Sequence, residues 1–341
     1  MNQRLEKIIE VEWKAQELQK RFTRSGPLIE QLTTITPGSF DITKKTSTPS
    51  QYLIIQGSFD PPTLSHLELL SRAIDLRRKI NPLNSIEVVF LLSLSHVDKK
   101  LNVLNRSLLG SRVEMLEKLS KSLDLQLAIT IGLSNVARYI DLIEAAQQSF
   151  SNIRNITFIM GLDVFKKVLD VYYYSEPLEK VFPLIFKADY FVAGREKVFS
   201  DKEFSLYLKN HLPTDYHQKV HFLAMPNHFR FLNATSIREG YSKNQSSQKN
   251  SIHPVIERYL EKENLYRSTS KWIATKIGIQ SIIQLTLEAG KDRIIAVEIL
   301  NHLLPLIESD ALLQQNLTNE YKTGKKIEIV KRWNQLLRLI S

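Results

Sequence analysis

The feature of this sequence that most constrains its fold is a regular alternation of short apolar runs and helix-like segments between residues 52 and 224. Each run is long enough for one buried strand, and between the runs apolar residues recur at helical spacing, as over residues 63–79, 106–122 and 136–150. Strands that alternate with helices of this length predict an α/β fold, in which a parallel sheet carries helices on both faces. The expected strands are residues 52–56, 86–92, 125–130, 155–160, 189–193 and 220–224.

The segments on either side of this region have different patterns. Residues 2–23 have apolar side chains at helical spacing and predict one amphipathic helix that covers an apolar surface elsewhere. Residues 34–50 are rich in Thr, Ser and Pro and predict a linker or surface loop. Only helical spacing remains near the C-terminus, over residues 271–287, 292–307 and 326–340. The predicted organisation is an N-terminal helix and linker over 1–50, an α/β domain over 51–268 and a C-terminal helical extension over 269–341.

The composition excludes cysteine chemistry and limits the kinds of partner that the chain is expected to have. Its 341 residues include no cysteine, which excludes disulfides, thiol nucleophiles and iron–sulfur clusters. The 46 Lys and Arg against 36 Asp and Glu give a net charge of +10, which fits either a solvated basic surface or the binding of a polyanion. No apolar run reaches the roughly 18 residues of a membrane span, and the charged N-terminus lacks a signal-peptide core. We therefore expect a cytoplasmic protein, or a nucleocytoplasmic one if its source is eukaryotic, with no membrane partner.

Several functional classes lack their sequence signatures here. The phosphate-binding pattern GxxxxGK[ST] and the metalloprotease pattern HExxH are absent, and no aromatic and basic signature of nucleic-acid binding is evident. His211, His217 and His221 have no clear acidic partner in the sequence, so we interpret them as surface histidines. The sequence thus predicts neither a metal site made by the protein nor a nucleic-acid partner.

The segment GSFDPPTLSH, residues 57–66, directly follows the first expected strand. Gly57 has no Cβ, so a phosphate can approach the backbone there, and Ser58 and Phe59 offer N–H groups to it. Thr63 is a typical residue for the start of a helix, and His66 lies about one turn further on, on the same side. A helix N-terminus and an imidazole N–H are suited to stabilising charge on a phosphate during nucleotidyl transfer.

The segment NATSIREG, residues 233–240, follows the sixth expected strand. Asn233, Thr235 and Ser236 are good helix-starting residues, and Arg238 falls in the first turn. Hydroxyls, N–H groups and a guanidinium at one helix N-terminus make an anion site, which suits the β,γ-phosphates of a nucleoside triphosphate. An ordinary capped helix with an exposed arginine is the alternative interpretation.

The first of these segments resembles the HxGH-type motif of a nucleotidyltransferase superfamily. It is most similar to the motif of the nicotinamide and nicotinate mononucleotide adenylyltransferases. Thr63 stands at the place of the usual first histidine, Ser65 at that of the glycine, and His66 at that of the last histidine.

The second segment resembles the ISSTxIR motif of the same family. Asn233 and Ala234 replace the two serines, while Thr235, Ile237 and Arg238 match. The order and separation of the two segments also agree with the family, so their joint occurrence carries the resemblance.

The resemblance, which covers roughly residues 50–265, implies a Rossmann-like sheet and a set of substrate-binding residues. It implies catalytic roles for His66 and Arg238. Residues expected to bind ATP are Gly57, Ser58, Phe59, Thr63, His66, Gly161, Asp163, Thr235, Ser236 and Arg238. Residues expected to bind the mononucleotide are Ser58, Lys99, Arg112, Tyr139 and Arg195.

The family often has a tryptophan near the third strand that stacks on the nicotinamide-type ring, and this sequence has none there. Its tryptophans are Trp13, Trp272 and Trp333, all outside the α/β region, so Tyr139 is the expected substitute.

The implied activity is an adenylyl transfer from ATP, with Mg²⁺ on the triphosphate, to nicotinamide or nicotinate mononucleotide. The products are NAD or its acid form and pyrophosphate. Two alternatives stay open: a nucleotidyltransferase of the same superfamily with another acceptor, and a catalytically silent nucleotide-binding scaffold. The C-terminal helices fit an oligomerisation element, a lid or a partner surface.

Overall fold

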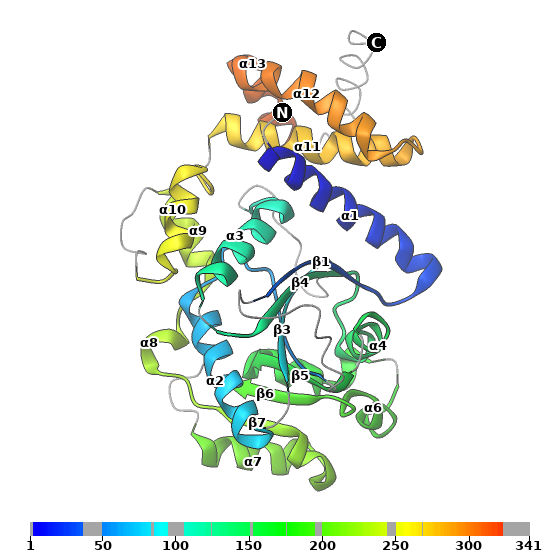
Figure 1. Ribbon diagram of the computed structural model, residues 1–341, viewed down its shortest axis with the longest axis vertical. Helices are drawn as coiled ribbons and strands as arrows, with labels where there is room; N and C mark the ends of the chain where they lie inside the picture. Colours follow the sequence, from blue (N-terminus) through cyan, green and yellow to red (C-terminus); the bar gives the residue numbers. More distant parts are fainter. Residues whose placement is uncertain are drawn as a thin grey trace.

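The computed structural model describes residues 3–36, 50–82, 85–94, 106–123, 125–150, 153–174, 176–194, 200–243, 250–267 and 269–322. Its centre is a seven-stranded sheet in the order β1-β4-β3-β2-β5-β6-β7 (Figure 1). The strands are β1 Ile29–Ile35, β2 Ser50–Gly57, β3 Ile86–Ser93, β4 Ala128–Ser134, β5 Ile153–Gly161, β6 Asp189–Ala193 and β7 Val220–Leu223. Neighbouring strands from β2 to β7 are parallel, and β1 joins β4 antiparallel. The predicted α/β class is confirmed.

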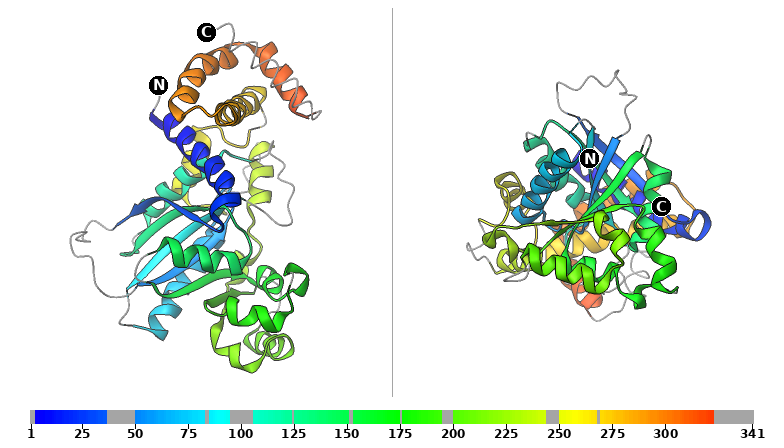
Figure 2. Two further views of the ribbon diagram at one scale, coloured as in Figure 1. Left: turned by 90° about the vertical axis from the view of Figure 1, so that its right-hand side faces the viewer. Right: turned by 90° about the horizontal axis from the view of Figure 1, so that it is seen from below.

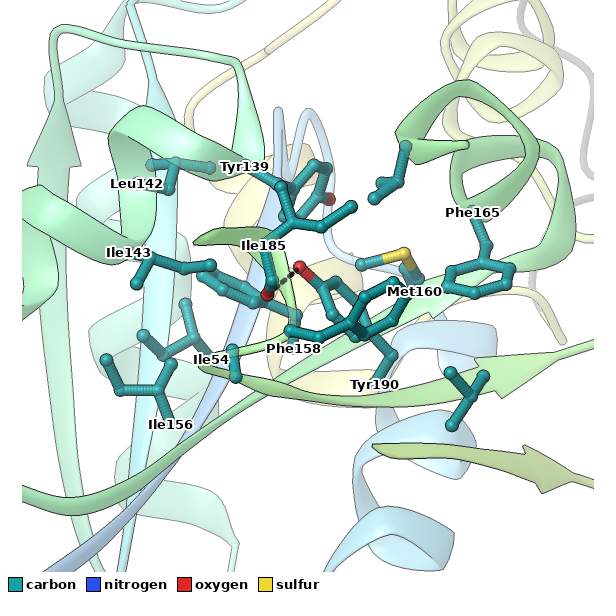
Figure 3. Packing of buried hydrophobic residues seen from close by; sticks show 14 of the residues in the cluster. Ile54, Tyr139, Leu142, Ile143, Ile156, Phe158, Met160, Phe165, Ile185 and Tyr190 are labelled. Atoms are coloured by element: carbon teal, nitrogen blue, oxygen red, sulfur yellow. Dashed lines mark hydrogen bonds between the residues drawn. The ribbon is translucent and has the colours of Figure 1, made fainter. Parts of the chain in front are cut away.

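Helices cover both faces of the sheet, because successive side chains of a buried strand point to opposite faces. Ile54 of β2 and Phe158 of β5 belong to the cluster on one face, part of which Figure 3 shows. The helices that pack there are α4 Tyr139–Ser149, α5 Leu162–Val168, α6 Leu178–Ile185 and α7 Asp201–His211. Leu53 and Ile55 belong to the cluster on the other face. The helices on that side are α1 Gln3–Ser25, α2 Leu64–Ile80 and α3 Leu109–Ser122.

Helix α1 connects the sheet to a helical layer at one end of the molecule (Figures 1 and 2). Val11 and Leu18 pack in the cluster over the sheet, whereas Ile9 and Trp13 pack in a separate cluster with the C-terminal helices. The expectation that the N-terminal helix covers an apolar surface is therefore confirmed. The C-terminal helices are α11 Ser270–Glu288, α12 Arg293–Ser309 and α13 Ala311–Lys322.

The remaining helices connect the sheet to this layer or follow its strands. They are η2 Val171–Tyr173, η3 Thr214–Lys219, α8 Asn227–Arg230, α9 Ala234–Ser242 and α10 Pro254–Lys262. Among the described helices, none is both long and apolar enough to cross a membrane.

Two strands differ from the sequence prediction. Strand β1 was not predicted, because its residues IEQLTTI are mostly polar and sit at the edge of the sheet, half-exposed. Strand β4 lies three residues later than the predicted run of 125–130. Gly132 lies inside β4, where a Cβ would come within 3.2 Å of the Glu30 carbonyl oxygen of β1. The glycine thus permits close pairing of the edge strand.

The helices also differ in part from the sequence prediction. Helix α3 begins at Leu109 rather than Arg106, because Ser107 turns toward the loop after β2. Helix α13 was not predicted and begins after Asp310, whose carboxylate accepts the N–H of Leu313 at 2.9 Å. The helix predicted over 326–340 and most of the predicted linker over 34–50 lie outside the described residues.

Candidate active site

Two glycines mark the point at which the strand order of the sheet reverses. The chain runs from β2 outward through β3 and β4, and then from β5 outward through β6 and β7 on the other side. Strands β2 and β5 are therefore neighbours, and they end at Gly57 and Gly161. Ligands of open parallel sheets bind beyond the carboxyl ends of the strands at such a reversal. Both predicted strand-end glycines thus lie at the expected edge.

The loop after β2 is shaped by Phe59. This residue has a φ of 44°, in the left-handed region, and its ring is buried edge-on to Phe90 with centroids 5.4 Å apart. The ring lies beside Gly57, where a Cβ would be 3.2 Å from Phe59 Cζ. Ser58, between the two, is half-buried. The Phe59 side chain therefore belongs to the core, and only its backbone remains to serve the phosphate role that the sequence predicts.

Thr63 and His66 hold each other at the start of α2. The Thr63 N–H donates to His66 Nδ1 at 3.0 Å, and Thr63 Oγ1 lies 2.7 Å from the same nitrogen. Because Nδ1 accepts the backbone N–H, the neutral ring carries its proton on Nε2 and is a donor there. Thr63 is buried, while His66 is half-buried with its ring 5.2 Å from that of Phe59. An Nε2–H donor is what stabilisation of a phosphate by an imidazole N–H requires.

The Asp60 side chain fixes the loop through buried hydrogen bonds. Its carboxylate is fully buried, and Oδ1 accepts hydrogen bonds from Ser107 Oγ at 2.5 Å and Tyr266 Oη at 2.7 Å. Oδ2 lies 3.6 Å from Arg112 Nη2. Arg112 also donates twice to the Ser107 carbonyl oxygen, at 3.1 and 2.7 Å. The predicted mononucleotide residue Arg112 is thus engaged in a buried network, and its contact with a mononucleotide stays a prediction.

The second motif meets the first at this loop. Asn233 is the N-cap of α9, and its Oδ1 accepts from the backbone N–H of Ser236 at 2.9 Å and from its hydroxyl at 3.0 Å. Arg238 is buried; its Nη1 donates to the Asp60 carbonyl oxygen at 2.5 Å and its Nη2 to Thr235 Oγ1 at 3.1 Å. Residues far apart in the sequence thus form one site, with the N-termini of α2 and α9 close to the same loop.

Comparison with known proteins assigns the chain at the level of a family. Residues 54–240, more than half of the 341, match the family model described as cytidylyltransferase-like. The chain belongs to the cytidylyltransferase-like family. Its predicted membership in the nucleotidyltransferase superfamily is confirmed at this level. No protein with a curated description matches the sequence.

Solved structures that are similar to this cytidylyltransferase-like chain include a Plasmodium falciparum nicotinic acid mononucleotide adenylyltransferase, complexed with NaAD or with APC. In both cases the identity is 19%, the TM-score is 0.46, and the match covers 64% of this chain and 98% of that one. A candidate nicotinate-nucleotide adenylyltransferase from Vibrio parahaemolyticus matches with 17% identity and a TM-score of 0.36, over 64% of this chain and 97% of that one.

The other predicted site residues of this cytidylyltransferase-like chain belong to segments outside the two motifs, and two of them, Lys99 and Arg195, are outside the described residues. Asp163 is exposed in the first turn of α5, directly beyond the end of β5, where Gly161 is the N-cap. Tyr139 is buried near Phe158 (Figure 3), and its ring is edge-on to that of Phe158 with the centroids 5.0 Å apart. Burial raises the pKa of its hydroxyl far above the usual range.

Sequence reasoning missed two residues that contact this loop and its surroundings, Tyr266 and Lys276. Tyr266, after α10, reaches Asp60 from outside both motifs. Lys276 of α11 donates from Nζ to the carbonyl oxygen of Arg106 at 2.7 Å. No local pattern marks these residues, because each acts through a partner more than a hundred positions away in the chain.

Proposed function

We propose that this chain catalyses adenylyl transfer from ATP to nicotinamide or nicotinate mononucleotide. The observation that carries the proposal is the convergence of His66, fixed by Thr63 at the start of α2, and Arg238, fixed on the Asp60 carbonyl oxygen. Both lie at the reversal point of the sheet, where phosphates bind in this architecture. The choice of acceptor rests on the resemblance of the two motifs.

In the proposed reaction, a phosphate oxygen of the mononucleotide attacks the α-phosphorus of ATP. A new P–O–P bond forms as the bond between the α-phosphorus and the bridging oxygen breaks, and pyrophosphate leaves with that oxygen. Negative charge grows on the oxygens of the α-phosphoryl group and on the leaving group. The chain needs no covalent nucleophile, only donors that are positioned before the reaction begins.

Each motif supplies donors for one part of this charge. The Nε2–H of His66 is assigned to the α-phosphoryl oxygens, with the helix N-terminus of α2 behind it. Thr235, Ser236 and Arg238 are assigned to the β,γ end of ATP. Ser236 already donates its hydroxyl to Asn233, so this hydrogen bond has to break before the hydroxyl donates to a phosphate.

We propose that Mg²⁺ enters with ATP and takes its ligands mainly from phosphate oxygens and water. The side chains of the described site residues are compatible with an Mg²⁺ ion that is bound mainly by phosphate and water. The carboxylate of the motif loop, Asp60, is buried and engaged with Ser107 and Tyr266, and the described residues contain no cluster of three His, Cys, Asp or Glu able to hold a metal ion. When bound, the ion neutralises charge on the triphosphate.

A second candidate keeps this chemistry but changes the acceptor. The observation that favours it is the burial of Tyr139, the residue expected to stack on the nicotinamide-type ring, within the aromatic core of the sheet. Stacking by this ring would require it to leave that packing. An acceptor without a nicotinamide-type ring makes no such demand.

The test is pyrophosphate release from ATP and Mg²⁺ with either mononucleotide, compared among wild type, His66→Ala and His211→Ala. His211 is an exposed histidine of α7 and serves as the matched control. We expect His66→Ala to lower turnover by roughly 10²-fold or more while ATP affinity changes little. Turnover within a few-fold of wild type would refute the role of His66.

Failure with both mononucleotides separates the remaining possibilities. Release with another phosphate-bearing acceptor, in a screen with ATP and CTP, would establish the second candidate. ATP binding without release from any acceptor would make the chain a nucleotide-binding scaffold and overturn the proposed transfer.

A further inference from the structure

Two arginines beside the motif loop, one buried and one half-buried, have buried guanidinium nitrogens without a hydrogen-bond partner among the described residues. They are Nε of Arg238, whose side chain is nine-tenths buried, and Nη1 of Arg106, just before α3. Neither residue forms an ion pair within the described part of the chain. A buried donor left unpaired costs free energy. Two such donors at one loop indicate that a ligand or water is to be bound there.

The charges around this loop favour an anion. Among the described residues, Arg106, Arg112 and Arg238 supply three guanidinium groups here and Lys276 adds an amine, against the carboxyl groups of Asp60 and Glu12. Burial lowers the pKa of the Arg106 guanidinium, and repulsion from Arg112 lowers it further. Asp60 is saturated at Oδ1 and faces Arg112 with Oδ2. The excess positive charge therefore falls on Arg106 and Arg238.

Arg106 is held in place from the C-terminal helical layer. Lys276 of α11 is almost fully buried, and its Nζ donates to the Arg106 carbonyl oxygen at 2.7 Å. Its ammonium also lies 4.4 Å from the centre of the Trp272 ring, which favours the cation. The Asp60 carboxylate accepts a hydrogen bond from the hydroxyl of Tyr266, which lies in the segment before the same helix. A part of the chain outside both motifs thus positions a cation of the site.

We propose that Arg106 is an additional phosphate-binding residue of the site, which holds the polyphosphate tail of a nucleoside triphosphate together with Arg238, and that Lys276 positions it. The identity of the anion as a nucleotide tail rests on the proposed function. The alternative partner of these nitrogens is water, which can satisfy the same donors. The C-terminal helices are then required for phosphate binding, in addition to any role in assembly.

The test is calorimetric binding of inorganic tripolyphosphate, and separately of ATP with Mg²⁺, to the full chain. The variants are Arg106→Met and Arg106→Lys, with Arg258→Met of α10 as an exposed arginine control. We expect Arg106→Met to weaken both ligands roughly tenfold or more, because it removes a charge-assisted hydrogen bond. Arg106→Lys should recover part of the affinity and Arg258→Met should equal wild type. Equal tripolyphosphate affinity in wild type and Arg106→Met overturns the proposal and leaves water as the partner of these nitrogens.

The role of Lys276 has its own signature. Lys276→Met should raise the KM for ATP several-fold with little change in the KM for the acceptor, while the melting temperature stays equal or rises, because a buried charge is removed. Lys271→Met, an exposed change on the same helix, is the control. Parallel loss of melting temperature and of both KM values would mean a merely structural role and refute positioning by Lys276.

These results are separable from the proposed reaction. Tripolyphosphate binding that depends on Arg106, in a protein that releases no pyrophosphate with any acceptor, supports the anion site and overturns only the transfer reaction. Normal pyrophosphate release together with unchanged tripolyphosphate affinity in Arg106→Met supports the transfer reaction and overturns only the anion site.

Discussion

Replacement of Gly110 by alanine tests the contact between α1 and α3 on which the site edge depends. Gly110 lies in the first turn of α3, and a Cβ there would be 2.5 Å from the Cα of Ile8 and 3.0 Å from its carbonyl oxygen. Real Cβ atoms do not approach other heavy atoms this closely, and the nearest atom, Ile8 Cα, belongs to the backbone of α1. Helix α1 must therefore move away from α3.

Two unfavourable contributions and one favourable contribution set the expected change in the free energy of unfolding. Overpacking of a tight contact costs typically 1–3 kcal/mol. Movement of α1 also withdraws Glu12, whose Oε1 caps α3 by accepting the N–H groups of Leu109 and Gly110, and loss of such a cap costs about 1 kcal/mol. Against this, alanine gains roughly 1 kcal/mol over glycine in helix propensity. We expect Gly110→Ala to lower the free energy of unfolding by about 2 kcal/mol.

The assay is urea unfolding followed by circular dichroism, with Lys121→Ala, an exposed change in α3, as the control. A third protein, Ile8→Ala with Gly110→Ala, should show no rescue, because the nearest atom is Ile8 Cα rather than its side chain. A Gly110→Ala protein as stable as wild type, or one restored by the Ile8 change, would refute the reasoning.

Three further predictions concern the site and the core. Thr63→Val removes the hydroxyl 2.7 Å from His66 Nδ1 but keeps the backbone bond, so turnover in the pyrophosphate assay should fall roughly three- to tenfold; an unchanged rate contradicts this. Arg77 Nη2 lies 2.9 Å from Asp189 Oδ2 in the core, and Arg77→Met leaves this carboxylate without its buried cation. The free energy of unfolding, measured by urea unfolding, should therefore fall by about 3 kcal/mol. Burial lowers the pKa of Lys276 to about 7 from 10.5, so the folded chain binds fewer protons than the unfolded chain between these values. Stability of wild type should therefore rise relative to Lys276→Met as pH increases from about 7 to about 10; a constant difference between the two proteins over that range would show that this lysine titrates normally.

The sequence by itself determined the elements whose signal is local. Strand β6 was predicted at its observed residues, and β2, β3 and β5 within a few, because a buried parallel strand is a continuous apolar run. The two motif segments were also found from sequence, because glycine after a strand and capping residues before a helix act on their immediate neighbours.

Only the tertiary structure decided which side chains meet. It placed Tyr139 in the core, turned Arg112 to Ser107 and Asp60, and brought Tyr266 and Lys276 to the loop after β2. It also added the edge strand β1, whose polar residues gain their order by pairing with β4. These outcomes depend on the packing of segments far apart in the chain. Periodicity reports which face of an element is buried, but not which partner buries it.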